Sequence, residues 1–271
     1  MISILMRSKN DILYIRRTVE ALLAQEADDT FEIVSCDDHS TDGTAEYLAS
    51  IPQIRRLESP EGRYVPGKVL NYMVRQARGE YIVFNNGDAI PQNREYLKNL
   101  TTPLKDSSVD CVFANQIARP DACIPVRLDY ERAFGDGSIA SKWHKFFSLV
   151  SSGFRKEELL KHPFDETFQY SEDSQWVNRR EVKIVYVPDA IVEHSHNYTP
   201  CELQKRFFNE GKADIQMGKK SPGLLKTWKI ICVSILRDWI YMTKCGEWKA
   251  FFYSPRYRYT QKMSYYKGTK Q

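Results

Sequence analysis

The sequence lacks the features that mark secreted and membrane-spanning proteins. Its six cysteines form no C-x-x-C pair and no short disulfide framework, a scatter typical of reduced thiols in a reducing compartment. No apolar run approaches the roughly 18 residues that a spanning helix needs. The chain enters directly into Ile2-Ser3-Ile4-Leu5, without the basic segment and long apolar stretch of a secretory signal. We therefore expect a cytoplasmic protein.

A glycine-rich turn is missing after the first strand pattern. Dinucleotide-dependent oxidoreductases carry G-x-G-x-x-G at that point, whereas here the turn reads Arg7-Ser8-Lys9-Asn10. The sequence also has no glycine-rich, basic N-terminal loop of the kind found in enzymes that make sugar nucleotides. Both classes are therefore set aside.

Most of the chain has no net positive charge, which is confined to its end. The 271 residues carry a formal net charge of +4. From Met217 onward, nine lysines and three arginines stand against Asp238 and Glu247, which makes this segment +10 and leaves the first 216 residues at −6. We predict one α/β domain over residues 1–216 and a basic, aromatic-rich helical extension over residues 217–271.

The extension has two interpretations. Six of its residues fall at helical spacing, namely Trp228, Ile231, Cys232, Ile235, Trp239 and Met242. They predict either a helix packed on the larger domain or an interfacial helix on an anionic membrane, where lipid-linked molecules are found. Binding to nucleic acid is disfavoured, because the larger domain is acidic.

Strand and helix patterns alternate along the first 216 residues. Strands are predicted at residues 2–6, 31–36, 81–85, 109–114 and 183–187, and helices at residues 11–25, 44–50, 68–77 and 173–180. This alternation predicts an α/β fold with a mixed, mostly parallel sheet and helices on both faces. Ligands of such sheets bind outside the carboxyl ends of the strands. The polar clusters that follow the strands therefore form the candidate site.

Two adjacent acids, Asp37 and Asp38, follow the second strand and precede a helix. A carboxylate at this point can accept a hydrogen bond from the imide N–H of uracil or thymine. The alternative is a helix cap made by Ser40, Thr41 or Asp42. Capping accounts for the hydroxyl residues but not for two acids at the end of a strand.

Two further clusters suggest a metal site. Asn86-Gly87-Asp88 follows the third strand, and its aspartate is suited to hold a divalent cation, which prefers oxygen ligands. The alternative is an ordinary turn. His194 and His196 follow the last strand, and imidazole is a frequent metal ligand. No third or fourth Cys or His neighbour completes a structural zinc site.

Glu172 and Asp173 lie at the start of a predicted helix. Acids are favoured at a helix N-terminus, which is the structural interpretation. The functional interpretation makes one of them a general base that takes a proton from a hydroxyl group.

In this order the clusters resemble glycosyltransferase family 2 over residues 1–216, and within it the bacterial rhamnosyltransferases. The resemblance is carried by Gly79-Glu80-Tyr81-Ile82-Val83-Phe84, Gly87-Asp88-Ala89-Ile90-Pro91, Gln116-Ile117-Ala118-Arg119-Pro120-Asp121-Ala122, Phe164-Asp165-Glu166, Glu172-Asp173-Ser174-Gln175-Trp176, His194-Ser195-His196-Asn197-Tyr198-Thr199 and Phe207-Phe208-Asn209-Glu210-Gly211. Each segment has modest specificity, and their common order makes the resemblance strong.

The resemblance implies a GT-A fold, a nucleotide-diphosphate sugar donor and a Mn²⁺ or Mg²⁺ ion. It also implies that the nucleotide is bound by five residues, namely Arg7, Asp37, Asp38, Lys68 and Gly87. Asp88 corresponds to the last aspartate of the family's D-x-D motif. Asn86 replaces the first aspartate, so a site with two carboxylates is in doubt.

The missing carboxylate gives more weight to His194 as a second metal ligand, with His196 as the reserve candidate. By the same resemblance Asp173, with Glu172 beside it, is the expected catalytic base. Sugar transfer with inversion, which the resemblance implies, needs no covalent enzyme intermediate. No serine or cysteine nucleophile is therefore expected.

We expect an inverting glycosyltransferase that moves a sugar, most simply rhamnose from dTDP-rhamnose, to a hydroxyl of a polysaccharide or lipid-linked glycan. Two alternatives remain, namely the same fold with a UDP-hexose donor and a non-catalytic subunit that binds nucleotide sugars. Asn86 favours the non-catalytic subunit, whereas Asp88, Asp173 and the two histidines argue against it.

Overall fold

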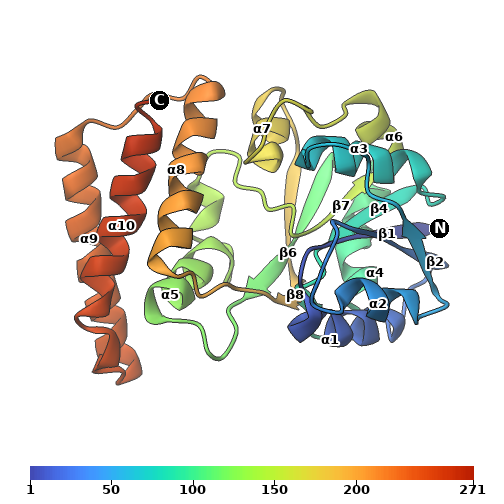
Figure 1. Cartoon of the computed structure of the whole chain (residues 1–271), viewed down its shortest axis with the longest axis horizontal. Coiled ribbons are helices and arrows are strands. Elements are labelled where there is room, and N and C mark those ends of the chain that lie inside the picture. The colour runs from blue at the N-terminus through green and yellow to red at the C-terminus, as the bar shows by residue number, and fades with distance from the viewer. The chain divides into compact units, whose positions relative to one another are not determined.

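The computed structural model describes all residues, Met1–Gln271 (Figure 1). The chain divides into two compact units. The first unit comprises Met1–Ile117 and Phe134–His194, and the second comprises Ala118–Ala133 and Ser195–Gln271. All the candidate site residues except His196 therefore belong to the first unit.

One eight-stranded sheet forms the centre of the first unit. Its strands are β1 (Ile2–Ser8), β2 (Phe31–Asp37), β3 (Ile54–Leu57), β4 (Tyr81–Asn85), β5 (Ile90–Pro91), β6 (Cys111–Ile117), β7 (Ser151–Arg155) and β8 (Ile184–Glu193). Their order is β3-β2-β1-β4-β7-β6-β8-β5. The pairs β3–β2, β2–β1, β1–β4 and β6–β8 are parallel, whereas β7 runs antiparallel between β4 and β6 and β5 runs antiparallel to β8. The expected mixed, mostly parallel sheet is confirmed.

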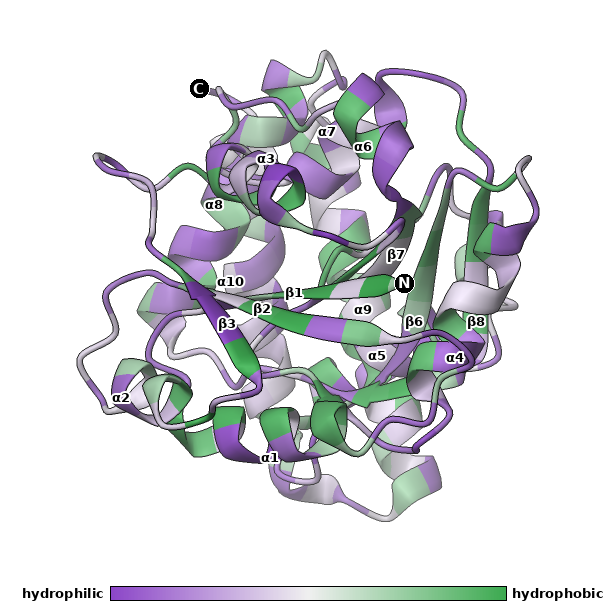
Figure 2. Cartoon of the chain, turned by 90° about the vertical axis from the view of Figure 1, so that its right-hand side faces the viewer, coloured by the Kyte–Doolittle hydropathy of each residue, from purple (hydrophilic) through white to green (hydrophobic).

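Helices cover both faces of this sheet, as expected (Figure 2). They are α1 (Ile12–Leu23), α2 (Thr44–Ala49), α3 (Pro66–Gln76), α4 (Tyr96–Thr101), α6 (Lys156–Lys161) and α7 (Glu172–Asn178), with short 3₁₀ turns at Thr102–Lys105 and Ala140–Lys142. In Figure 2, α1, α2 and α4 lie on one face and α3, α6 and α7 on the other. Helix α1 shows the reason, because its buried residues Ile15, Val19 and Leu22 recur at helical spacing and face the apolar side chains of the strands.

Helix α7 is fixed on the sheet by a tryptophan. The Trp176 indole is fully buried and donates a hydrogen bond of 2.6 Å from Nε1 to the carbonyl of His162. Its ring meets the ring of Phe154, on β7, edge to face at 5.2 Å. This anchor gives Glu172 and Asp173, at the start of the same helix, a defined position over the sheet.

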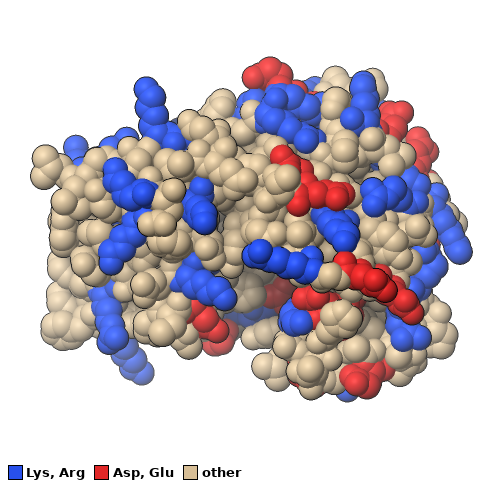
Figure 3. Space-filling view, turned by 45° about the horizontal axis from the view of Figure 1, so that its top comes forward, with Lys and Arg blue, Asp and Glu red and all other residues tan.

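The second unit is helical. Its elements are α5 (Ile124–Ala133), α8 (Pro200–Gln216), α9 (Leu224–Cys245), a 3₁₀ turn at Trp248–Ala250 and α10 (Tyr253–Gly268). Helices α8 and α10 touch backbone to backbone, because a Cβ on Gly211 would lie 2.2 Å from the carbonyl oxygen of Tyr265. Lys and Arg side chains are spread over the C-terminal helices on the face drawn in Figure 3.

The predicted helical character of the C-terminal extension is confirmed, but its buried face differs from the prediction. Ile231 and Met242 are buried as part of the stripe Thr227, Ile231, Ser234, Asp238 and Met242. Trp228 and Cys232, predicted on the same face, are exposed. The polar members of the stripe explain the shift, because Asp238 is buried through a 2.7 Å ion pair with Arg258 on α10. No helix of the structure is long and apolar enough to cross a membrane.

Candidate active site

The carboxyl ends of β1, β2, β4, β6 and β8 lie at one edge of the sheet. Asp38 follows β2 directly, Asp88 follows the end of β4 by three residues, and His194 follows β8 directly. The expectation that these polar clusters share one edge therefore agrees with the topology.

Gly87 brings the turn after β4 close to the end of β1. Its amide donates a 2.9 Å hydrogen bond to the carbonyl of Arg7. A Cβ at this position would lie 2.9 Å from Cδ1 of Ile15 and 3.0 Å from Oδ2 of Asp11. A side chain here would require these neighbours to shift, so glycine permits the close approach that places the next residue, the buried Asp88.

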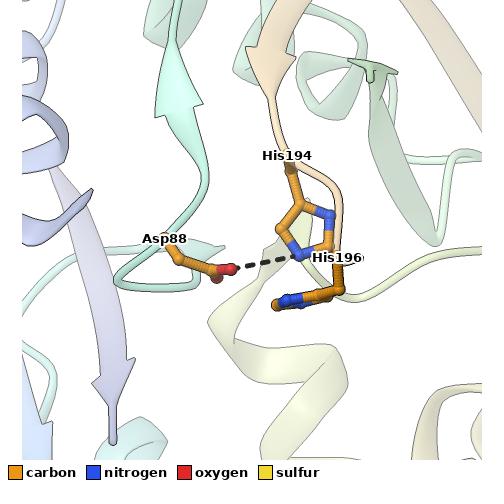
Figure 4. A group of neighbouring side chains, drawn as sticks. All are labelled: Asp88, His194 and His196. Atoms are coloured by element: carbon orange, nitrogen blue, oxygen red, sulfur yellow. Dashed lines mark ion pairs between the residues drawn. The ribbon is translucent and has the colours of Figure 1, made fainter. Parts of the chain in front are cut away.

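His194 is oriented by a glutamine on the neighbouring strand. Its Nδ1 lies 3.0 Å from Oε1 of Gln116, and the Gln116 Nε2 donates a 2.7 Å hydrogen bond to Oγ of Ser148. The glutamine amide oxygen can only accept, so Nδ1 of His194 donates and its Nε2 is left as the basic nitrogen. Nε2 lies 3.6 Å from Oδ2 of Asp88 (Figure 4).

This arrangement fits a divalent cation. Asp88, His194 and His196 each offer one ligand atom, and the three atoms lie within 4.8 Å of one another. The distance between Asp88 and His194 is longer than a direct hydrogen bond, and a carboxylate facing a basic nitrogen is compatible with a cation between them. An oxygen ligand combined with imidazole nitrogen suits Mn²⁺ better than Mg²⁺, which prefers oxygen ligands alone.

The two adjacent acids of α7 have different environments. Oε1 of Glu172 lies 3.4 Å from Nη1 of Arg7, which also lies 3.3 Å from the hydroxyl of Tyr64. Asp173 instead accepts hydrogen bonds from the amides of Ser174, at 2.7 Å, and Leu149, at 3.4 Å.

Burial, followed by the charge of Glu172, raises the pKa of Asp173 to about 6, against the lowering effect of those two hydrogen bonds. A carboxylate with such a pKa is suited to accept a proton near neutral pH.

The segment between Ser148 and Val150 joins these groups. Ser148 holds the amide that orients His194, and the amide of Leu149 donates to Asp173. The carbonyl of Val150 accepts a 2.9 Å hydrogen bond from the amide of Asn86, in the turn that carries Asp88. Three consecutive residues thus fix Asp173, His194 and Asp88 relative to one another.

The side chains expected to bind the nucleotide differ in the hydrogen bonds and ion pairs that they already make within the protein. Asp37 accepts hydrogen bonds from the hydroxyls of Ser8 and Ser40, at 2.7 and 2.6 Å, so it holds the loop after β2. The Asp38 side chain is 26% exposed and lies 3.4 Å from Nζ of Lys9. Lys68 donates a 2.9 Å hydrogen bond to the carbonyl of Glu61.

Sequence reasoning gave no role to three groups of this site. They are the Gln116 side chain, the Tyr64 hydroxyl and the Leu149 amide. The only signal for Gln116 was its place in one of the segments that carried the resemblance. The predicted strand at residues 109–114 stopped short of it, whereas β6 extends to Ile117 and β8 to Glu193, which brings Gln116 beside His194.

Comparison with known proteins identifies related chains. A family model described as glycosyl transferase family 2 matches residues 3–172. An O-antigen chain rhamnosyltransferase of Salmonella typhimurium is 24% identical over 202 residues, which cover 66% of this chain and 62% of that protein. An O-antigen chain rhamnosyltransferase of Salmonella anatum is also 24% identical, over 66% of this chain and 61% of that protein. The match thus spans less than two thirds of the length of these relatives.

Solved structures share the fold. A mannosyltransferase of Pyrobaculum calidifontis, in complex with GDP-Man and Mn²⁺, is 18% identical with a TM-score of 0.69, covering 99% of this chain and 86% of that one. Glucosyl-3-phosphoglycerate synthase of Mycobacterium tuberculosis, in complex with Mn²⁺, UDP and phosphoglyceric acid, is 18% identical with a TM-score of 0.58, covering 82% of this chain and 80% of that one.

The geometry of the metal site leads to a prediction. Asp88→Ala and His194→Ala should each weaken Mn²⁺ binding at least tenfold, and His196→Ala should weaken it less. Gln116→Ala should weaken it by about 10- to 100-fold, the usual effect of removing the partner that orients a ligating histidine. The measurement is titration of Mn²⁺ with nucleoside diphosphate present, with the exposed His144→Ala as the matched control. A larger loss in His196→Ala than in His194→Ala would mean that the ligand assignment is displaced by two residues.

Proposed function

The chain belongs to glycosyl transferase family 2, and from this we propose that it is an inverting glycosyltransferase with a nucleotide-diphosphate sugar donor. Its acceptor is a hydroxyl of a polysaccharide or of a lipid-linked glycan. The observation that carries the proposal is the connection, through residues 148–150, of a carboxylate with a pKa of about 6 to the Asp88–His194 pair. Inverting transfer needs a base on one side of the sugar and charge stabilisation on the other.

The proposed reaction is one displacement at the anomeric carbon. The acceptor oxygen forms a bond to that carbon while the bond from the carbon to the β-phosphate oxygen breaks. Asp173 takes the acceptor proton, and the nucleoside diphosphate leaves with the electron pair. Attack from the side opposite the leaving group inverts the anomeric configuration. No covalent enzyme intermediate forms.

The remaining residues bind and orient the donor. A divalent ion held by Asp88 and His194, with His196 in reserve, would stabilise negative charge on the leaving diphosphate as a Lewis acid. Asp38 accepts the imide N–H of the base, while Asp37 keeps its loop in place. Glu172 holds Arg7 near the nucleotide, and Lys68 contributes positive charge.

The donor we propose is dTDP-rhamnose. Support comes from the two relatives that are named as O-antigen chain rhamnosyltransferases. The alternative is a UDP-hexose, because a carboxylate that reads the imide edge accepts thymine and uracil equally. A non-catalytic subunit is the remaining alternative, and it would release no nucleoside diphosphate.

We also propose that the second unit attaches to an anionic membrane surface on the cytoplasmic side. On α9, Leu225, Trp228, Lys229, Leu236 and Ile240 recur at helical spacing and are exposed, opposite the buried stripe. The Leu225 side chain is 87% exposed. Apolar residues interleaved with basic ones suit the headgroup region of an anionic bilayer.

Asp173→Asn should lower transfer by about 10²- to 10⁴-fold, the usual effect of losing a general base. Binding of nucleoside diphosphate should persist. In the wild type, kcat/KM should fall as the pH drops below about 6, because the base is then protonated.

The variant should fold at least as stably as the wild type at pH 7.5. The pKa of Asp173 is raised on folding, so its stabilising contribution is present at low pH and is lost as the pH rises through about 6. The control is Glu157→Gln, at an exposed acid on α6. Near-normal turnover of Asp173→Asn would move the role of base to Glu172.

The donor is tested by release of nucleoside diphosphate with Mn²⁺ present. We expect release from dTDP-rhamnose and little from UDP-hexoses, and melting temperatures that rise with dTDP by mass action. Release of nucleoside diphosphate from a UDP-hexose alone would contradict the proposed rhamnose donor but would still support glycosyltransferase activity. Absence of release from every donor would favour the non-catalytic subunit.

Membrane attachment is tested by co-sedimentation of the full chain with vesicles of phosphatidylglycerol or of phosphatidylcholine. The wild type should sediment with the anionic vesicles at low salt, since each basic residue near such a surface contributes about 1 kcal/mol. High salt should reduce binding. The double variant Leu225→Glu, Leu236→Glu should stay in the supernatant, whereas Leu13→Glu, at an 80% exposed leucine on α1, should not change binding. Wild type that remains in the supernatant at low salt would refute attachment.

A further inference from the structure

A cavity of about 620 Å³ lies in the first unit, on the segment that precedes the candidate site. Its walls come from residues 136–146 and from the first halves of β6 and β8. A volume of this size is within the range of small-molecule sites. None of the catalytic, nucleotide or metal residues named above lines it.

One side of the cavity is aromatic. The ring of Tyr186 lies 5.1 Å from the ring of Phe113, and the ring of Phe146 meets that of Trp143 at 5.2 Å, edge to face. The Trp143 side chain is 39% exposed although its neighbours in this cluster are more buried. An indole that is partly exposed on a cavity wall offers a flat apolar surface to a ligand.

The Tyr186 ring is held in place from two directions. Its hydroxyl donates a 2.8 Å hydrogen bond to the carbonyl of Gly135. A Cβ on Gly137, which has φ of +76°, would lie 2.8 Å from Cδ1 of the ring. The backbone of the segment therefore packs directly on the ring, so this wall is formed before any ligand binds.

The other side of the cavity is polar. It is lined by Asp136, Ser138 and Ser141. Oδ1 of Asp136 accepts a 2.9 Å hydrogen bond from the amide of Ser138, and the Ser141 hydroxyl donates a 3.1 Å hydrogen bond to the carbonyl of Ser138. Lys145 also lines it, but its ammonium donates to the carbonyl of Arg180 at 2.8 Å and lies 3.1 Å from Oε1 of Glu181. Because the lysine charge is paired, the cavity does not favour an anionic ligand. The oxygens of the Asp136, Ser138 and Ser141 side chains have further lone pairs that can accept hydrogen bonds from hydroxyl groups, which a hydrocarbon chain does not supply.

A neutral sugar ring matches both sides, because it has a face of C–H groups and an edge of hydroxyls. We propose that this cavity binds a neutral sugar unit of the acceptor glycan, at a distance from the hydroxyl that reacts. The inference rests on the proposed function for the identity of the glycan as acceptor.

The position of the cavity supports a remote subsite. Phe113 precedes Gln116 by three residues on β6, which corresponds to about 10 Å along the strand. This separation is too long for the sugar that reacts and suits another unit of the same chain. Residues 136–146 also lead into Ser148 and Leu149, so an occupied cavity lies on the segment that holds the base.

The test is saturation-transfer NMR with methyl α-L-rhamnoside, methyl α-D-mannoside and methyl α-D-galactoside, without donor or metal. At least one glycoside should bind the wild type, with its C–H face receiving the most saturation. Trp143→Ala should weaken that binding about tenfold. Trp143→Phe, which keeps a flat ring, should restore part of it. The matched control is Trp248→Ala, at another exposed indole outside the cavity.

A second variant does not depend on the tryptophan. Asp136→Asn should weaken binding of the same glycoside while the melting temperature stays near that of the wild type. Absence of saturation transfer to all three glycosides would overturn the proposal, as would equal binding by wild type and Trp143→Ala. Release of nucleoside diphosphate from the donor is measured separately, so the absence of glycoside binding would not contradict the proposed transferase activity. Binding of a glycoside without release of nucleoside diphosphate would contradict the proposed transferase activity and support the proposed sugar-binding cavity.

Discussion

Three consecutive backbone and side-chain contacts, made by residues 148–150, hold the candidate site together. They exist because β7 runs antiparallel between β4 and β6. A strand inserted in that direction begins at the edge where its parallel neighbours end, so the residues before it are delivered to that edge. Ser148, Leu149 and Val150 then reach Gln116, Asp173 and Asn86 in turn. The reversal of one strand in the sheet therefore fixes Asp173, on α7, relative to the groups that follow β4 and β8.

The pair Glu172 and Asp173 shows how neighbours in sequence acquire different chemistry. Glu172 lies against the Arg7 guanidinium, whereas Asp173 faces two amides in a buried environment. Burial penalises the charged form of Asp173, and the nearby charge of Glu172 adds to that penalty. The site thus keeps a carboxylate that costs folding stability at neutral pH, a cost more readily explained by proton transfer than by helix capping.

The two units differ in the functional features that they carry. The first unit holds the sheet, the acidic clusters and the aromatic cavity, while the second presents an exposed apolar and basic stripe on α9. The close backbone contact at Gly211 and the Arg258–Asp238 pair fix the helices of the second unit internally. That internal packing lets one face of α9 stay exposed without unfolding the helix.

The sequence by itself determined the parallel part of the sheet, because buried parallel strands and their helices leave strong apolar periodicity, as in residues 2–6 and 81–85. It also pointed to Asp38, Asp88 and His194, since polar residues after strands of a parallel sheet share one edge. Asp173 was indicated instead by the acidic pair at the start of a helix and by the family resemblance. It did not reveal β7, whose Ser-Ser-Gly-Phe-Arg sequence has little apolar character. Gly153 in this strand packs closely on its neighbour, since a Cβ there would lie 2.8 Å from Cγ2 of Val112. Nor did it reveal the polar stripe of α9, which is buried only because Arg258 neutralises Asp238 from another helix. The orientation of His194 was likewise decided by tertiary structure, because Gln116 is distant from it in sequence. The raised pKa of Asp173 was decided in the same way, because its largest cause is burial in the folded chain.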